Sequence, residues 1–117
     1  MDAEELKKRT KKFALRIIKL VNFLPNNTAG RTIGGQIFRS GTSVASNYRA
    51  VCRARSKAEF ISKLGIVEEE IDETIFWLEI IIESGLVEEG LVSSLLKEAN
   101  EICAIVVKSK KTAKGWR

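Results

Sequence analysis

Basic side chains are the residues of this sequence best suited to binding chemistry. Guanidinium groups can bind phosphate through two parallel hydrogen bonds, and each phosphate that a cation neutralises releases counterions. Two groups of basic residues are therefore candidates for contact with nucleic acid. They are Arg49, Arg53 and Arg55, and Lys8, Lys12, Arg16 and Lys19. For the second group, a solvated helix face is the alternative.

Arg39 has a different expected role. If the segments before and after residue 55 fold back on one another as helices, Arg39 comes level with residues near 71. Glu70 or Glu73 could then reach it, which predicts a structural ion pair. The arginines at 49–55 would instead face segment 57–61, where Glu59 is the one carboxylate, so they are the better candidates for ligand contact.

The acidic cluster at residues 68–73 invites a metal-binding interpretation, which the sequence does not favour. Bundles that bind two metal ions use Glu and His side chains projecting into the core, but this chain has no histidine. Val67 and Ile71 already occupy the expected core positions. We therefore expect solvated carboxylates or salt bridges between subunits, and no metal or other cofactor. The cluster comprises Glu68, Glu69, Glu70, Asp72 and Glu73.

The lack of histidine also weighs against enzymatic activity, because it removes the usual general base and the usual member of nucleophilic triads. The glycine-rich stretch "GRTIGG" lacks the Lys-Ser/Thr of a phosphate-binding loop and follows no strand. We expect no catalytic residues and no bound nucleotide.

Charge is segregated along the chain. The net charge is +5, but residues 1–63 carry +10 and residues 64–107 carry −10. Such segregation can create an electrostatic partner surface, or helices that neutralise one another. We expect both effects.

Composition indicates one compact domain. Hydrophobic residues make up 44% and charged residues 30% of 117 positions. No apolar run approaches the roughly 20 residues of a membrane span, and no secretory signal opens the chain, so a cytoplasmic location without membrane contact is expected. Cys52 and Cys103 have no zinc-ligand spacing and are expected to be buried thiols, with a single disulfide between them as the alternative.

Apolar periodicity predicts an all-α protein, an antiparallel up-down-up-down four-helix bundle. Pro25 ends the first helix, and Ser56 with Glu59 forms a capping box that starts the third. The predicted helices cover about 3–24, 28 or 31 to 53, 57–84 and 88–110, within a domain of 1–112 that is followed by a flexible tail at 113–117.

The stretch "RSGTSVASNYRA" at 39–50 resembles a loop in composition but keeps helical spacing of apolar positions. Gly41 and its small neighbours would allow close approach of another helix, while a true loop is the alternative. The third helix has an apolar face too wide for one neighbour. Phe76, Trp77 and Ile80 are therefore candidates for an interface between subunits, with bundle core as the alternative.

The segment "QIFRSGTSVASNYRAVCRARSKAEFISKLGIVEEEIDETIFWLEII" resembles the 23S rRNA intervening-sequence protein family, which includes the accessory proteins of diversity-generating retroelements. The most specific positions include Gln36, Arg39, Ser43 and Asn47. Many members have Ala-Glu-Gly after the Asn, whereas this chain has an arginine-rich stretch. The resemblance implies a homopentameric bundle without catalytic residues and, for retroelement members, binding to a reverse transcriptase and to nucleic acid.

These observations together favour a non-enzymatic homo-oligomer whose basic surface binds RNA, DNA or a nucleic-acid-processing partner such as a reverse transcriptase. The alternative is a structural adaptor that binds a protein and uses its charges for subunit assembly.

Overall fold

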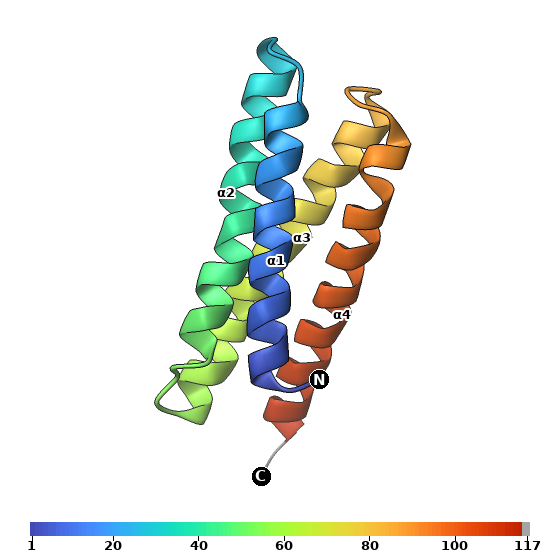
Figure 1. The fold of residues 1–117 in the computed structure, drawn as a ribbon. Helices are drawn as coiled ribbons and strands as arrows, with labels where there is room; N and C mark the ends of the chain where they lie inside the picture. Colours follow the sequence, from blue (N-terminus) through green and yellow to red (C-terminus); the bar gives the residue numbers. More distant parts are fainter. Residues whose placement is uncertain (116–117) are drawn as a thin grey trace.

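The computed structural model describes residues 1–115 and contains four long helices. They are α1 (Ala3–Phe23), α2 (Thr28–Val51), α3 (Lys57–Glu83) and α4 (Ser93–Gly115), with a short 3-10 turn, η1 (Glu89–Leu91), before α4. Each helix runs opposite to the one before it (Figure 1). The predicted all-α, up-down-up-down four-helix bundle is confirmed.

Side-chain caps explain where three helices begin. Asp2 accepts a hydrogen bond from the backbone N–H of Glu5 at 2.8 Å, and Asn27 accepts one from Gly30 at 2.8 Å. Ser56 accepts one from Glu59 at 3.1 Å, which is half of the predicted capping box. Gly85 has φ +69° just beyond α3, a conformation that favours glycine and ends the helix.

Two boundaries differ from the predicted ones. The fourth helix begins at Ser93, after η1, and it continues to Gly115. Lys114 in its last turn suits the negative end of the helix dipole. Residues 113–115 of the predicted tail are thus helical, and residues 116 and 117 lie outside the described residues, so flexibility there stays a prediction.

The stretch at 39–50 is helical throughout, and its small residues Ser40 and Gly41 are buried together with Val44. A Cβ built on Gly41 would lie 2.9 Å from both Cγ1 and Cγ2 of Ile17, so α1 and α2 approach closely there. Val67 and Ile71, the predicted core positions of α3, are buried together with Leu64, Thr74, Leu78 and Ile81, while Phe60 at the start of the helix is half-buried.

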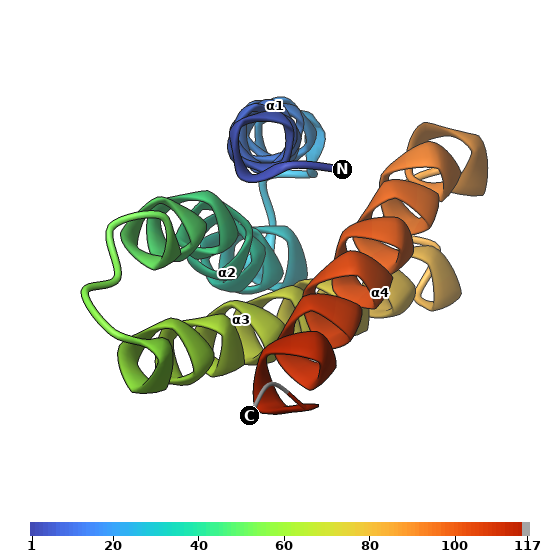
Figure 2. The ribbon, with the colours of Figure 1, turned by 90° about the horizontal axis from the view of Figure 1, so that it is seen from below.

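The bundle is open along one seam. Successive helices pack along their lengths, whereas α1 and α4 touch each other only sparsely. Viewed from below, α4 crosses over α3 and leans away from α1 (Figure 2). Long polar side chains therefore add to the sparse contacts between α1 and α4.

The expectation of two buried thiols is wrong for Cys52. This residue caps the end of α2, where the chain leaves the bundle, and it is exposed. Cys103 is half-buried on α4, where burial raises the pKa of its thiol, and both cysteines are free. Among residues 1–115, no helix combines the length and apolarity needed to cross a lipid bilayer.

Candidate nucleic-acid interface

The end of α2 and the start of α3 form a basic hollow of about 340 Å³. The α2–α3 connection turns the chain back on itself, which brings Lys63 of α3 beside the arginines of the connection. Arg49, Arg53 and Arg55 are all exposed. The residues that line this arginine hollow are Ser46, Arg49, Ala50, Arg53, Arg55, Glu59 and Lys63.

The arginine hollow has little internal charge compensation. Glu59 is the one carboxylate in its lining, and Arg55 Nε lies 3.8 Å from Glu59 Oε2 while the Arg55 side chain is 89% exposed. Within the described part of the chain, Arg49 and Arg53 have no ion-pair partner. The arginine hollow is therefore a concentrated cationic site that an external anion can reach.

The basic group of α1 lies elsewhere, and the structure does not bring it into the arginine hollow. Arg16 Nη2 donates a 2.7 Å hydrogen bond to Ser94 Oγ of α4. Lys12 lines a pocket that also contains Glu98, while Lys8 and Lys19 are exposed. Within this group, Arg16 is therefore engaged with α4 and Lys12 lies beside a carboxylate, whereas Lys8 and Lys19 remain accessible to a ligand.

Arg9 connects α1 to α4 across the open seam, and sequence reasoning missed this contact. Its Nε and Nη2 donate to the two carboxylate oxygens of Glu98 at 2.6 and 2.7 Å, and Nη2 also donates to Glu101 Oε1 at 2.7 Å. The hydrogen bonds from Arg9 lower the pKa of Glu98. The i,i+3 spacing of Glu98 and Glu101 is a sequence signal for a shared cation on a neighbouring helix.

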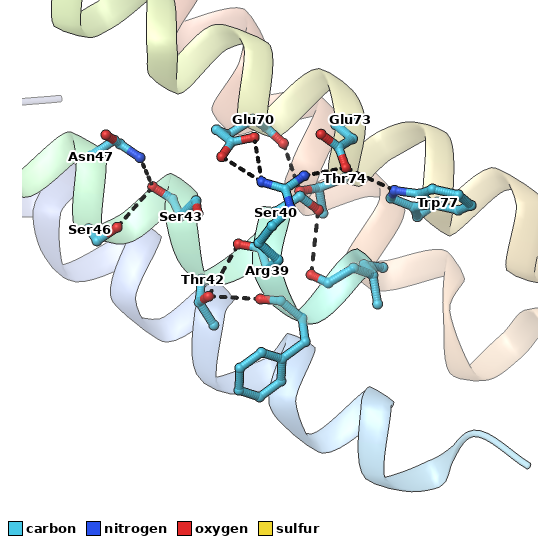
Figure 3. Close-up of polar contacts among 12 residues, drawn as sticks. Arg39, Ser40, Thr42, Ser43, Ser46, Asn47, Glu70, Glu73, Thr74 and Trp77 are labelled. Carbon is cyan, nitrogen blue, oxygen red and sulfur yellow. Dashed lines mark hydrogen bonds and ion pairs between the residues drawn. The ribbon is translucent and has the colours of Figure 1, made fainter. Parts of the chain in front are cut away.

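Arg39 lies between Glu70 and Glu73, the carboxylates predicted for it (Figure 3). Its Nη1 is 3.0 Å from Glu70 Oε2, and its Nη2 donates to Glu73. Trp77 Nε1 donates to the same Glu73 oxygen at 3.1 Å. The hydrogen bond from Arg39 and then that from Trp77 lower the pKa of Glu73. This network ties α2 to α3 through the ion pair predicted for Arg39.

A buried hydroxyl pair lies beneath this ion pair (Figure 3). Thr74 Oγ1 is 2.9 Å from Ser40 Oγ and 2.8 Å from the backbone oxygen of Glu70. Both residues are fully buried, so this contact is a polar link between α2 and α3 inside the core.

The remaining carboxylates of the acidic cluster do not converge. Glu68 pairs with Lys110 Nζ of α4 at 2.5 Å, while Glu69 and Asp72 are exposed. No grouping of three metal-ligating side chains occurs within residues 1–115. The cluster mainly connects α3 to its neighbours by ion pairs.

The candidate interface residues lie on the outer part of α3. Phe76 is 50% exposed, and its ring packs edge-on against Trp77 with centroids 5.0 Å apart. Trp77 and Ile80 are half-buried. Ile66, 42% exposed, adds to the exposed apolar surface of this helix.

The fold and its cationic end define a small antiparallel four-helix bundle with a basic surface hollow. The chain belongs to the 23S rRNA-intervening sequence protein family, whose model matches residues 4–108. It is also similar to a solved structure, a protein with unknown function from the S23 ribosomal protein family of Bacteroides thetaiotaomicron. The two are 34% identical with a TM-score of 0.87, over 95% of this chain and 99% of that one.

No curated protein matches the chain. Neither the family description nor that of the Bacteroides protein names an enzymatic activity. The match to the family model confirms the resemblance noted for the α2–α3 segment.

Proposed function

We propose that this protein is a non-enzymatic, homo-oligomeric bundle that binds nucleic acid through the arginine hollow. The observation that carries the proposal is the placement of Arg49, Arg53 and Lys63 around one exposed hollow with a single carboxylate, Glu59. Three arginines and a lysine facing solvent suit the phosphate backbone of RNA or DNA.

Oligomer formation is the second element of the proposal. Exposed Phe76 and Ile66 on α3 offer an apolar contact, and the opposite charges of the α1 and α3 regions favour contact between copies. A pentamer, which the family resemblance implies, would carry about +25 and concentrate positive charge around its axis. A nucleic-acid-processing enzyme such as a reverse transcriptase fits this proposal as a further partner.

Fluorescence anisotropy with RNA and DNA oligonucleotides at rising salt tests nucleic-acid binding. We expect affinity to fall steeply with salt and weak dependence on base sequence, because phosphate contacts carry no direct sequence information. The triple variant R49Q/R53Q/R55Q should bind more weakly. Its salt slope should be shallower by about 0.9 for every duplex phosphate that the variant no longer neutralises.

A matched variant, K8Q/K12Q/K19Q, removes the same charge from α1. It should retain more affinity than the arginine variant, because the proposal depends on the hollow rather than on net charge. Equal losses of affinity would refute the arginine hollow as the site. No detectable binding at about 50 mM salt would reject nucleic-acid binding altogether.

The alternative is a structural adaptor that binds a protein and whose charges serve subunit assembly. Within one chain, the ion pairs of Arg9 and Arg39 engage basic side chains with acidic helices, so these two cations have a use other than phosphate binding. An adaptor would show no salt-dependent nucleic-acid binding in the same experiment, and its partner would remain bound after nuclease treatment.

A further inference from the structure

A second, larger pocket lies beside the arginine hollow. Its volume is about 810 Å³, within the roughly 300–1,000 Å³ range of small-molecule sites. The start of α3, the α2–α3 connection and the C-terminal part of α4 form it. Phe60 and Ile105 supply apolar walls, and Lys108 lies at its edge.

The two hollows share the same stretch of chain. Residues of the connection alternate between them: Arg53 and Arg55 line the arginine hollow, whereas Ala54 and Ser56 line the larger pocket. The first turns of α3 do the same, with Lys63 on one side and Phe60 on the other. A chain-like ligand can therefore contact both hollows at once.

We infer that this larger pocket, called here the Phe60 pocket, binds an unpaired base of a single-stranded nucleic acid whose phosphates lie in the arginine hollow. This inference rests on the proposed function and narrows its ligand to a strand with free bases. Stacking on an aromatic ring tolerates any base, because every base has a π-face. Lys108 adds positive charge beside the pocket, which suits the phosphates that flank an inserted base.

Phe13, the one aromatic residue among the basic positions 7–19 of α1, is fully buried, so this helix offers no ring for stacking. The tertiary structure supplies a ring elsewhere, because the α2–α3 hairpin and the end of α4 place half-buried Phe60 in a pocket whose connection residues alternate with the arginines of the hollow. A base-paired duplex keeps its bases stacked inside the helix and could not use this pocket. The inference therefore predicts a preference for single strands.

The test compares an ordinary single-stranded oligonucleotide with one of the same length that carries abasic sites. Both have the same phosphates, so the arginine hollow should bind both. The wild-type protein should bind the strand with bases about 5- to 100-fold more tightly, and a 2-aminopurine in that strand should change its fluorescence on binding.

Phe60→Leu keeps apolar volume but removes the aromatic face. It should bring affinity for the strand with bases down towards that for the abasic strand and leave affinity for the abasic strand unchanged. Phe60→Trp should restore the preference, which separates stacking from a folding defect. Phe23→Leu, a 67% exposed phenylalanine at the opposite end of the bundle, is the matched control and should change neither affinity.

Equal wild-type affinity for the two strands would overturn the base pocket while leaving the arginine hollow intact. A Phe60→Leu loss of affinity that is the same for both strands would also overturn it, because a structural defect gives that pattern. No salt-dependent binding of either strand would reject the proposed function and the base pocket together. A fatty acid that occupies the pocket without displacing the strand with bases would likewise contradict the inference, because the base would then not lie in the pocket.

Discussion

Gly41 of α2 lies directly against Ile17 of α1, with no room between them for another carbon atom. A Cβ on Gly41 would come within 2.9 Å of two carbons of Ile17, a fully buried side chain. The small residues of the loop-like stretch therefore allow close packing of two helices.

Gly41→Ala should destabilise the fold. Alanine gains about 1 kcal/mol of helix propensity over glycine, but overpacking a filled core costs about 1–3 kcal/mol. We expect a net loss of about 1 kcal/mol, measured by chemical denaturation. Gly35→Ala is the control, since a Cβ there meets nothing within 4 Å, and it should stabilise by up to about 1 kcal/mol. A stabilising Gly41→Ala would contradict the close contact.

Arg9→Gln should weaken the connection between α1 and α4. Arg9 and Glu98 are about four-fifths buried and share two hydrogen bonds, so removing the cation leaves a partly buried carboxylate without its partner. We expect a loss of about 1–2 kcal/mol in the free energy of unfolding. Lys11→Gln, an exposed residue of the same helix, should change stability by less than about 0.5 kcal/mol. Equal effects of the two variants would show that the bridge does not stabilise the fold.

Acid should selectively weaken the same bridge. Arg9 holds the pKa of Glu98 in the folded protein below 4.5, the ordinary value that applies to the unfolded chain. The stabilisation from this contact is therefore fully present when the pH is above about 4.5. It is lost as the pH falls through the lower folded pKa. The stability difference between wild type and Glu98→Gln should therefore be largest at pH 7 and shrink in acid. Arg9→Gln should show the same convergence, and a difference constant with pH would disprove the linkage.

The buried hydroxyls of Ser40 and Thr74 should be energetically coupled. Each single change, Ser40→Ala or Thr74→Val, removes one partner of the 2.9 Å hydrogen bond and should cost about 0.5–1.5 kcal/mol. The double variant should cost less than the sum of the single losses, because no hydroxyl is then left without its partner. A strictly additive double variant would mean that each hydroxyl bonds only its own helix backbone.

Phe76→Ser should reduce self-association. The half-exposed ring lies on the outer part of α3, where loss of apolar area weakens a contact between copies without opening the core. Sedimentation velocity should show an oligomer for wild type at micromolar concentration and smaller species for the variant. Phe38→Ser, a 45% exposed phenylalanine on α2, is the comparison. A wild-type monomer at that concentration would refute the oligomer proposal.

Contacts between helices that follow one another were predictable from sequence. The register of Arg39 with Glu70 and Glu73 follows from one hairpin, whose turn position is marked by Ser56 and a break in apolar spacing. The buried face of each helix follows from the periodicity of its apolar side chains. The Arg39 register and the buried faces were both predictable because they depend only on spacing along one segment or two adjacent segments.

Sequence by itself therefore determined the four helices, their antiparallel order and the pairing within the α2–α3 hairpin, because these depend on local periodicity, caps and short connections. Only the tertiary structure decided that α4 leans away from α1, that Arg9 spans the resulting seam to Glu98, and that the end of α4 joins Phe60 in one pocket. Those relationships depend on the tilt and rotation of whole helices, which the packing of buried side chains sets collectively and which no local spacing encodes.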